Sequence, residues 1–180
     1  MFRFVFSILS LFALLGTTSS LLAQDNPFKK AEVGDWVSYE MKVDAGGQTF
    51  TTTMKQTLKE KTTKEATVAV EVTAQGRTFN QEQKIPLDKP YDPAEMAKQQ
   101  GGGQADVKKM GEGKDTIEVG GKKYNCTWMQ LKVTVKQFNL ETTSKVWMSS
   151  EVPLSGLVKM ETDIMGRKMV MEMTGHGKAK

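Results

Sequence analysis

The residues with the clearest chemical potential are methionines at alternate positions near the C-terminal end of the sequence. Met169, Met171 and Met173 are separated by single residues, and the one histidine of the chain, His176, follows them. On a β-strand, alternate side chains project from the same face, about 6.6 Å apart along the chain. Because soft sulfur ligands select Cu(I), copper binding is one interpretation of this pattern. The others are core packing and an adaptable apolar pocket, since methionine is a flexible apolar side chain.

Side chains that commonly catalyse reactions are sparse. Because His176 stands four residues from the end of the sequence, where chains commonly fray, we do not expect nucleophile–histidine catalysis. The acidic residues fall on strand positions where alternation predicts solvent, and Asp92 and Glu95 fit helix-capping roles. We therefore expect no enzyme, cofactor or catalytic metal. The alternative is a hydrolase whose carboxylates meet only in the fold, since a glycosidase mechanism needs no local motif.

The first 23 residues are typical of a secretory signal peptide. Arg3 precedes an apolar run over residues 4–15, and small and polar residues follow up to Ala23. The apolar run is too short to span a bilayer with its flanks. We expect cleavage after Ala23 and a mature chain, residues 24–180, in the periplasm or outside the cell. A bacterial lipid-attachment signal would need cysteine where the chain has Gln24, so no membrane anchor is expected.

Composition indicates one β-rich domain that depends on its apolar core. The net charge is +4, and basic and acidic residues are interspersed rather than grouped. The chain has no basic block of the kind that binds phosphate backbones, so nucleic acid is not an expected partner. The single cysteine, Cys126, has no partner for an internal disulfide, and we expect it to be buried and inert.

Four short turns predict antiparallel hairpins. The turns are centred on Gly46-Gly47, Gln75-Gly76, Gly120-Gly121 and Met165-Gly166. In each hairpin the alternation sets like side chains or opposite charges across from one another, which favours a single register. The expected pairs are Val43 with Phe50, Met41 with Thr52, Tyr39 with Met54, Val72 with Phe79, Thr73 with Thr78, Ile117 with Tyr124, Glu118 with Lys123, Met160 with Met171, Val158 with Met173, Thr162 with Met169, Lys159 with Glu172 and Asp163 with Lys168.

The strand expected over residues 122–136 changes its apolar phase. Apolar side chains occupy even positions up to Trp128 and odd positions from Met129 onward. A bulge near Trp128-Met129 would restore one buried face, with Trp128 largely buried, and would bend the strand. We therefore expect a mainly β fold, a curved antiparallel β-meander that forms a half or whole barrel, with one short helix in its central connection.

That central connection is a long loop over residues 88–113. Asp92-Pro93-Ala94-Glu95 has a capping residue, a proline at the first helical position and a glutamate at the third, so a short helix is predicted to about Gln100. A connection of this length either covers something or is a surface excursion. If it is a lid over the sheet, its contacts would come from Tyr91, Pro93 and Met96.

Three segments resemble small bacterial exported proteins of unknown function. They are Val33–Tyr39, Lys122–Trp128 and Lys145–Ser149. In outline the chain is similar to proteins of the outer-membrane lipoprotein carrier type, whose curved antiparallel sheet wraps an apolar cavity closed by helices. The resemblance implies an open barrel and assigns a role to no individual residue.

Taken together, these patterns predict an exported, non-enzymatic protein. Its partner would be an apolar small molecule or lipid held on the concave face of the sheet. The alternative is a structural or interaction protein with a filled core that contacts another cell-envelope protein. The candidate ligand-binding residues are Val133, Met148, Met160, Met169, Met171 and Met173.

Overall fold

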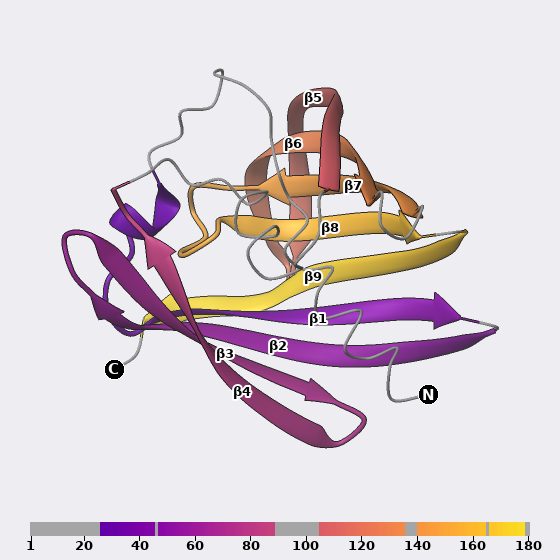
Figure 1. Ribbon diagram of the computed structural model, residues 1–180. Helices are drawn as coiled ribbons and strands as arrows, with labels where there is room; N and C mark the ends of the chain where they lie inside the picture. The colour runs from indigo at the N-terminus through magenta and orange to yellow at the C-terminus, as the bar shows by residue number, and fades with distance from the viewer. Residues whose placement is uncertain (1–25, 46, 89–104, 136–139, 165, 179–180) are drawn as a thin grey trace.

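Most of the chain forms a single antiparallel sheet (Figure 1). The computed structural model describes residues 26–45, 47–88, 105–135, 140–164 and 166–178. The strands are β1 (Asp35–Ala45), β2 (Gln48–Lys61), β3 (Glu65–Ala74), β4 (Arg77–Pro86), β5 (Ala105–Val119), β6 (Lys122–Val135), β7 (Leu140–Met148), β8 (Leu157–Ile164) and β9 (Arg167–Lys178). Over these ranges the one helical element is a 3₁₀ turn, η1 (Pro27–Lys29), and no helix is long and apolar enough to cross a membrane.

The sheet joins two meanders through its first and last strands. The strand order is β4-β3-β2-β1-β9-β8-β7-β6-β5, so β1 pairs with β9 in the middle and β4 and β5 form the edges. Figure 1 shows the sheet curving strongly, with the β5–β6 hairpin curled over at one side and β3–β4 twisted away at the other. Among the described strands β4 and β5 do not pair. The predicted curved antiparallel meander is therefore confirmed, as an open sheet rather than a closed barrel.

The predicted hairpin registers are also confirmed, with one exception. Each of the four turns joins the expected strands, and the observed ladders contain every expected pair except Val158 with Met173. The β8–β9 ladder begins at Lys159 and Glu172. Val158 stays out of the ladders because the β7–β8 register shifts beside it, between the Trp147 and Met148 pairs.

The predicted position of the bulge is wrong. Burial in β6 does change phase between Cys126 and Met129, but the β6–β7 ladder continues through this region without a shift. The irregularity lies on the neighbouring strand β5, at Met110. Trp128 is half-buried rather than buried, and its ring covers Gly111 and Gly113 of β5. Because β6 has no bulge, Trp128 and Met129 project from opposite faces of the sheet. The glycines of the edge strand leave room for the Trp128 indole on its face.

The central connection is shorter than predicted. Strand β5 begins at Ala105, so residues 105–113 belong to the sheet. Its many charged residues and glycines hide the usual apolar alternation because it is an edge strand with half-exposed faces. The helix predicted over residues 92–100 lies outside the described residues, as do the signal peptide and its cleavage site.

The core lies on one side of the sheet, which we call the inner face. On β1 it carries Val37, Tyr39 and Met41, all at most 4% exposed. Residues opposite these in the ladders share the inner face, because directly paired residues project to the same side of a sheet. Phe28 of η1 and Leu154 of the β7–β8 connection belong to the same apolar cluster. The open sheet therefore buries its inner face partly under its own turns.

Candidate functional site

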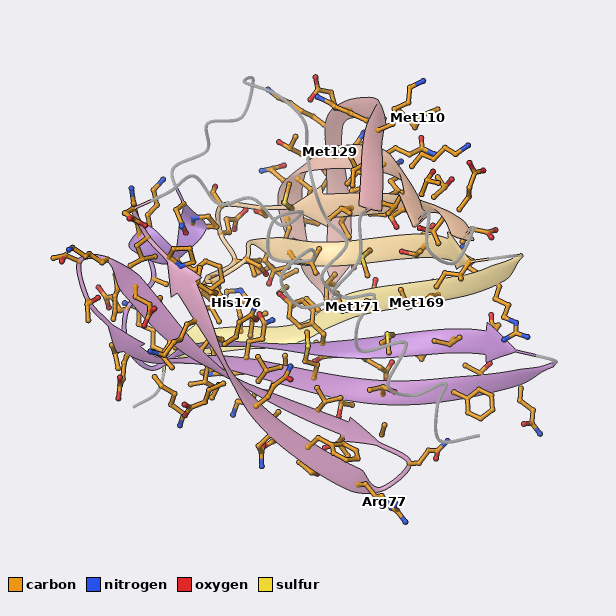
Figure 2. The ribbon with its side chains drawn as sticks, viewed as in Figure 1. Arg77, Met110, Met129, Met169, Met171 and His176 are labelled. Carbon is orange, nitrogen blue, oxygen red and sulfur yellow. The ribbon has the colours of Figure 1, made fainter. Side chains whose placement is uncertain are left out.

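The predicted methionines come together on the inner face. Met169, Met171 and Met173 lie along β9, and Met171 is opposite both Met160 of β8 and Met41 of β1. Figure 2 shows Met169 and Met171 side by side on β9 with His176 further along. All of these methionine side chains are at most 4% exposed and belong to one core cluster. These five residues, Met41, Met160, Met169, Met171 and Met173, form what we call the methionine row, and they are packed within the core.

The other predicted residues are more dispersed. Val133 is buried on β6 and is separated from Met160 by strand β7. Met148, at the end of β7, is half-buried and packs against the core from its margin. The predicted lid residues Tyr91, Pro93 and Met96 lie outside the described residues, so their role stays a prediction.

An accessible part of the inner face was not predicted as a site. From Tyr39 the same row of paired residues continues through Met54 of β2 and Val72 of β3 to Phe79 on the edge strand β4. Exposure varies along this row: Met54 is half-buried, Val72 is 4% exposed, and Phe79 at the sheet edge is 43% exposed. Phe50 of β2, which pairs with Val43, is 41% exposed.

We call Phe50, Met54 and Phe79 the apolar rim. Individual hairpin pairs in the sequence already placed Phe50 opposite Val43 and Phe79 opposite Val72. What the sequence did not indicate is that the pairing of β1 with β9 makes these residues continuous with the methionine row. Contiguous exposed apolar surface marks binding sites in many proteins, so the rim is a candidate for one.

Polar groups on the inner face are few and are mostly engaged. The Tyr39 hydroxyl donates to the carbonyl oxygen of Leu157 at 3.3 Å and lies 3.2 Å from Ser155 Oγ. The Ser144 and Thr162 hydroxyls pair at 2.9 Å. Gln56 of β2 differs from these, because its buried amide oxygen has no hydrogen-bond partner in the described part of the chain.

His176 forms a junction between strands that do not pair with each other. Its Nε2 lies 3.3 Å from the hydroxyl of Tyr124, which comes from the curled β5–β6 hairpin. Lys122 is 4.6 Å from the centre of the Tyr124 ring and forms an ion pair of 3.3 Å with Glu151. Burial, and then the positive charge of Lys122, lower the pKa of His176, while Glu151 acts in the opposite direction. His176 therefore engages a tyrosine rather than the methionine row.

The other polar, aromatic and thiol groups considered lie on the opposite, outer face of the sheet or are buried. Lys145 lies 4.3 Å and 4.6 Å from the ring centres of Trp128 and Trp147, and Trp147 Nε1 donates to Asp115 at 3.2 Å. A groove of about 450 Å³ over β2, β3 and β4 is lined mainly by polar residues. Burial raises the pKa of the Cys126 thiol, as expected for an inert side chain. The described residues contain no group of three His, Cys, Asp or Glu that could hold a metal ion.

Comparisons with known proteins identify the fold. No protein-family model matches the chain, and no curated protein matches it in sequence. Among solved structures, it is similar to a "putative exported protein with YmcC-like fold" from Bacteroides fragilis, with a TM-score of 0.51 and 10% identity over 82% of this chain and 97% of that chain. A "putative lipoprotein" from Parabacteroides distasonis matches with a TM-score of 0.48 and 11% identity over 81% and 96%.

A "putative outer membrane lipoprotein-sorting protein domain" from Vibrio parahaemolyticus is more distant, with a TM-score of 0.30 and 9% identity over 88% of this chain and 91% of that chain. At such identities a likeness shows the fold alone, and only the Bacteroides fragilis structure has a TM-score above 0.5 among these three. The resemblance in fold to exported bacterial proteins, expected from the sequence, is confirmed.

Proposed function

We propose that this chain is an exported, non-enzymatic protein of the cell envelope that binds an apolar or lipid-like ligand on the inner face of its sheet. The observation that carries the proposal is the continuity of the methionine row with the exposed apolar rim. A ligand on the rim would contact Phe50, Met54 and Phe79, and the flexible methionines behind them would adapt to its shape.

The exposure of the rim supports this proposal over a purely structural role. Phe50 and Phe79 remain more than 40% exposed although a neighbouring apolar core could have buried them. Fully burying such a side chain contributes about 1.5–3 kcal/mol relative to leaving it exposed. Because each ring is already more than half buried, a ligand that covers it would gain less than half of that contribution, about 0.6–1.3 kcal/mol for each ring.

The proposal can be tested with a fluorescent fatty acid and the delipidated chain of residues 24–180. Phe50→Ser and Phe79→Ser should each weaken binding by about tenfold, because each removes apolar contact area from the rim. Met110→Ser is the matched control, since Met110 is 54% exposed and lies on β5, far from the β3–β4 hairpin that carries Arg77 (Figure 2). The control should bind as the unsubstituted protein does.

Two outcomes would reject the proposal. If the unsubstituted protein binds no apolar probe, the alternative of an interaction protein with a filled core takes its place. If all three serine variants weaken binding equally, the probe is attaching to exposed apolar side chains in general rather than to the rim.

A further inference from the structure

Gln56 occupies an unusual position for an amide side chain. It lies on the inner face of β2, directly between Val37 of β1 and Val70 of β3. Both valines are at most 4% exposed, so the surroundings are apolar. In the part of the chain that the structure describes, the buried amide oxygen of Gln56 accepts no hydrogen bond.

A buried acceptor without a donor destabilises a folded protein, because the oxygen has lost its water without gaining a partner. Nearly all such groups in native proteins are paired, and an exception calls for an explanation. An apolar side chain of the same size would avoid the penalty at this position. A donor from outside the described residues, such as a bound ligand, would remove this penalty.

The geometry of the sheet places this acceptor next to the rim. Gln56 and Met54 are alternate residues of β2, so their side chains project from the inner face about 6.6 Å apart. Phe79 lies two strands beyond Met54 in the same row, roughly 10 Å away at the usual strand spacing. A ligand whose polar end reaches Gln56 would thus place its apolar chain over Met54 and towards Phe79.

We propose that Gln56 is a specificity-determining residue that accepts a hydrogen bond from the hydroxyl group of a long-chain amphiphile bound on the inner face. This inference rests on the proposed function and gives its ligand a chemical class. In this orientation of the Gln56 amide, an ether oxygen has no proton to donate and would face the amide oxygen as a second acceptor. A binding site built around a hydrogen bond rejects analogues that lack the bonding group, because its own polar atom is then left unpaired.

The test compares two ligands of the same chain length, one with a hydroxyl donor and one in which a methyl group replaces its proton. Displacement of the fluorescent fatty acid is measured with 1-dodecanol and with its methyl ether. The unsubstituted protein should bind the alcohol about tenfold more tightly than the ether. In Gln56→Met, which keeps an unbranched side chain of similar size, the two affinities should become equal. Gln130→Met is the matched control, since Gln130 is a half-buried glutamine on the outer face, opposite Lys145, and its variant should keep the tenfold preference.

The outcomes separate this inference from the proposed function. Equal affinities for alcohol and ether in the unsubstituted protein would overturn the role of Gln56 while leaving apolar binding intact. A preference that persists in Gln56→Met would also overturn it. Failure of both compounds to displace the probe, or of the probe to bind, would reject the proposed function and this inference with it. Gln56→Leu provides a second variant that lacks the acceptor, should the methionine variant fail to fold.

Discussion

Replacement of Gly113 by alanine should destabilise the protein, whereas the same replacement at Gly111 should not. A Cβ atom at Gly113 would lie 2.8 Å from Nε1 of Trp128, and one at Gly111 would lie 3.5 Å from the edge of the same ring. The first distance is a clash with a bulky side chain and the second is ordinary van der Waals contact. Overpacking typically costs about 1–3 kcal/mol. Neither glycine has a positive φ, so alanine should also gain about 0.4–1 kcal/mol from the reduced entropy of the unfolded chain.

The expected changes in the free energy of unfolding therefore have opposite signs. Gly113→Ala should lose about 1–2 kcal/mol, and Gly111→Ala should gain up to about 1 kcal/mol. Urea unfolding followed by far-ultraviolet circular dichroism measures both. Trp128→Phe removes the indole nitrogen and should reduce the cost of Gly113→Ala in a double-mutant cycle. Two results would show that the clash is not the reason for glycine at this position. One is a Gly113→Ala variant as stable as the unsubstituted protein, and the other is an equal loss of stability from Gly113→Ala in the Trp128→Phe background.

Four further measurements test the signal peptide, copper binding, His176 and Trp147. Mass spectrometry of the exported protein should find its N-terminus directly after Ala23, and retention of residues 1–23 in a membrane fraction would contradict the signal-peptide interpretation. Anaerobic titration with Cu(I) should find no tight site, before or after the three alternate methionines of β9 are replaced by leucine, and tight binding lost in that variant would establish a copper site. Because the pKa of His176 is lowered in the folded state, stability should be retained above about pH 6.5 and should decrease as the pH falls from there towards the folded pKa. In His176→Gln the decrease in unfolding free energy between about pH 7 and pH 5 should be shallower, and an unchanged slope would rule out this contribution. Trp147→Phe should cost about 1 kcal/mol through loss of the hydrogen bond to Asp115, and it should cost less when Asp115 is already replaced by alanine.

Local pairing was predictable from the sequence because a short turn leaves little freedom in register. Met160 opposite Met171 and Thr73 opposite Thr78 follow from the turn and the alternation alone. The pairing of β1 with β9 has no such signal, since the two strands are the first and last of the sheet. A repeated pattern does mark this junction: Trp36 covers Gly175 and Gly177 as Trp128 covers Gly111 and Gly113.

The position of the bulge was missed for a related reason. Burial changes phase in β6, but the adjustment that accommodates it is made at Met110, on a strand whose own sequence shows little alternation. The Gly111-Glu112-Gly113 segment was the available signal, because glycines within a strand commonly mark a close approach by another group. The methionine row was predicted correctly because it is local to β9. The rim was missed because four strand pairings, one of them non-local, connect Phe79 to the methionines of β9.

Differences in exposure across the inner face distinguish the residues that hold the fold together from those proposed to contact a ligand. Met169 and Met171 are 1–2% exposed and pack within the core, so replacing them would cost stability whether or not a ligand binds. Phe50 and Phe79 are more than 40% exposed, so changing them should cost less stability than changing a core methionine, and a loss of binding in variants that remain folded can be assigned to the ligand contact itself. Gln56 lies between these two regions, with a half-buried side chain and a shielded oxygen. Its replacement by methionine should raise the free energy of unfolding of the free protein, because the unpaired acceptor is removed, and should at the same time abolish the preference for a hydroxyl group. A Gln56→Met variant that is more stable but no longer selective would argue against a purely structural role for Gln56. A less stable variant would show that the amide already has a hydrogen-bond partner in the free protein.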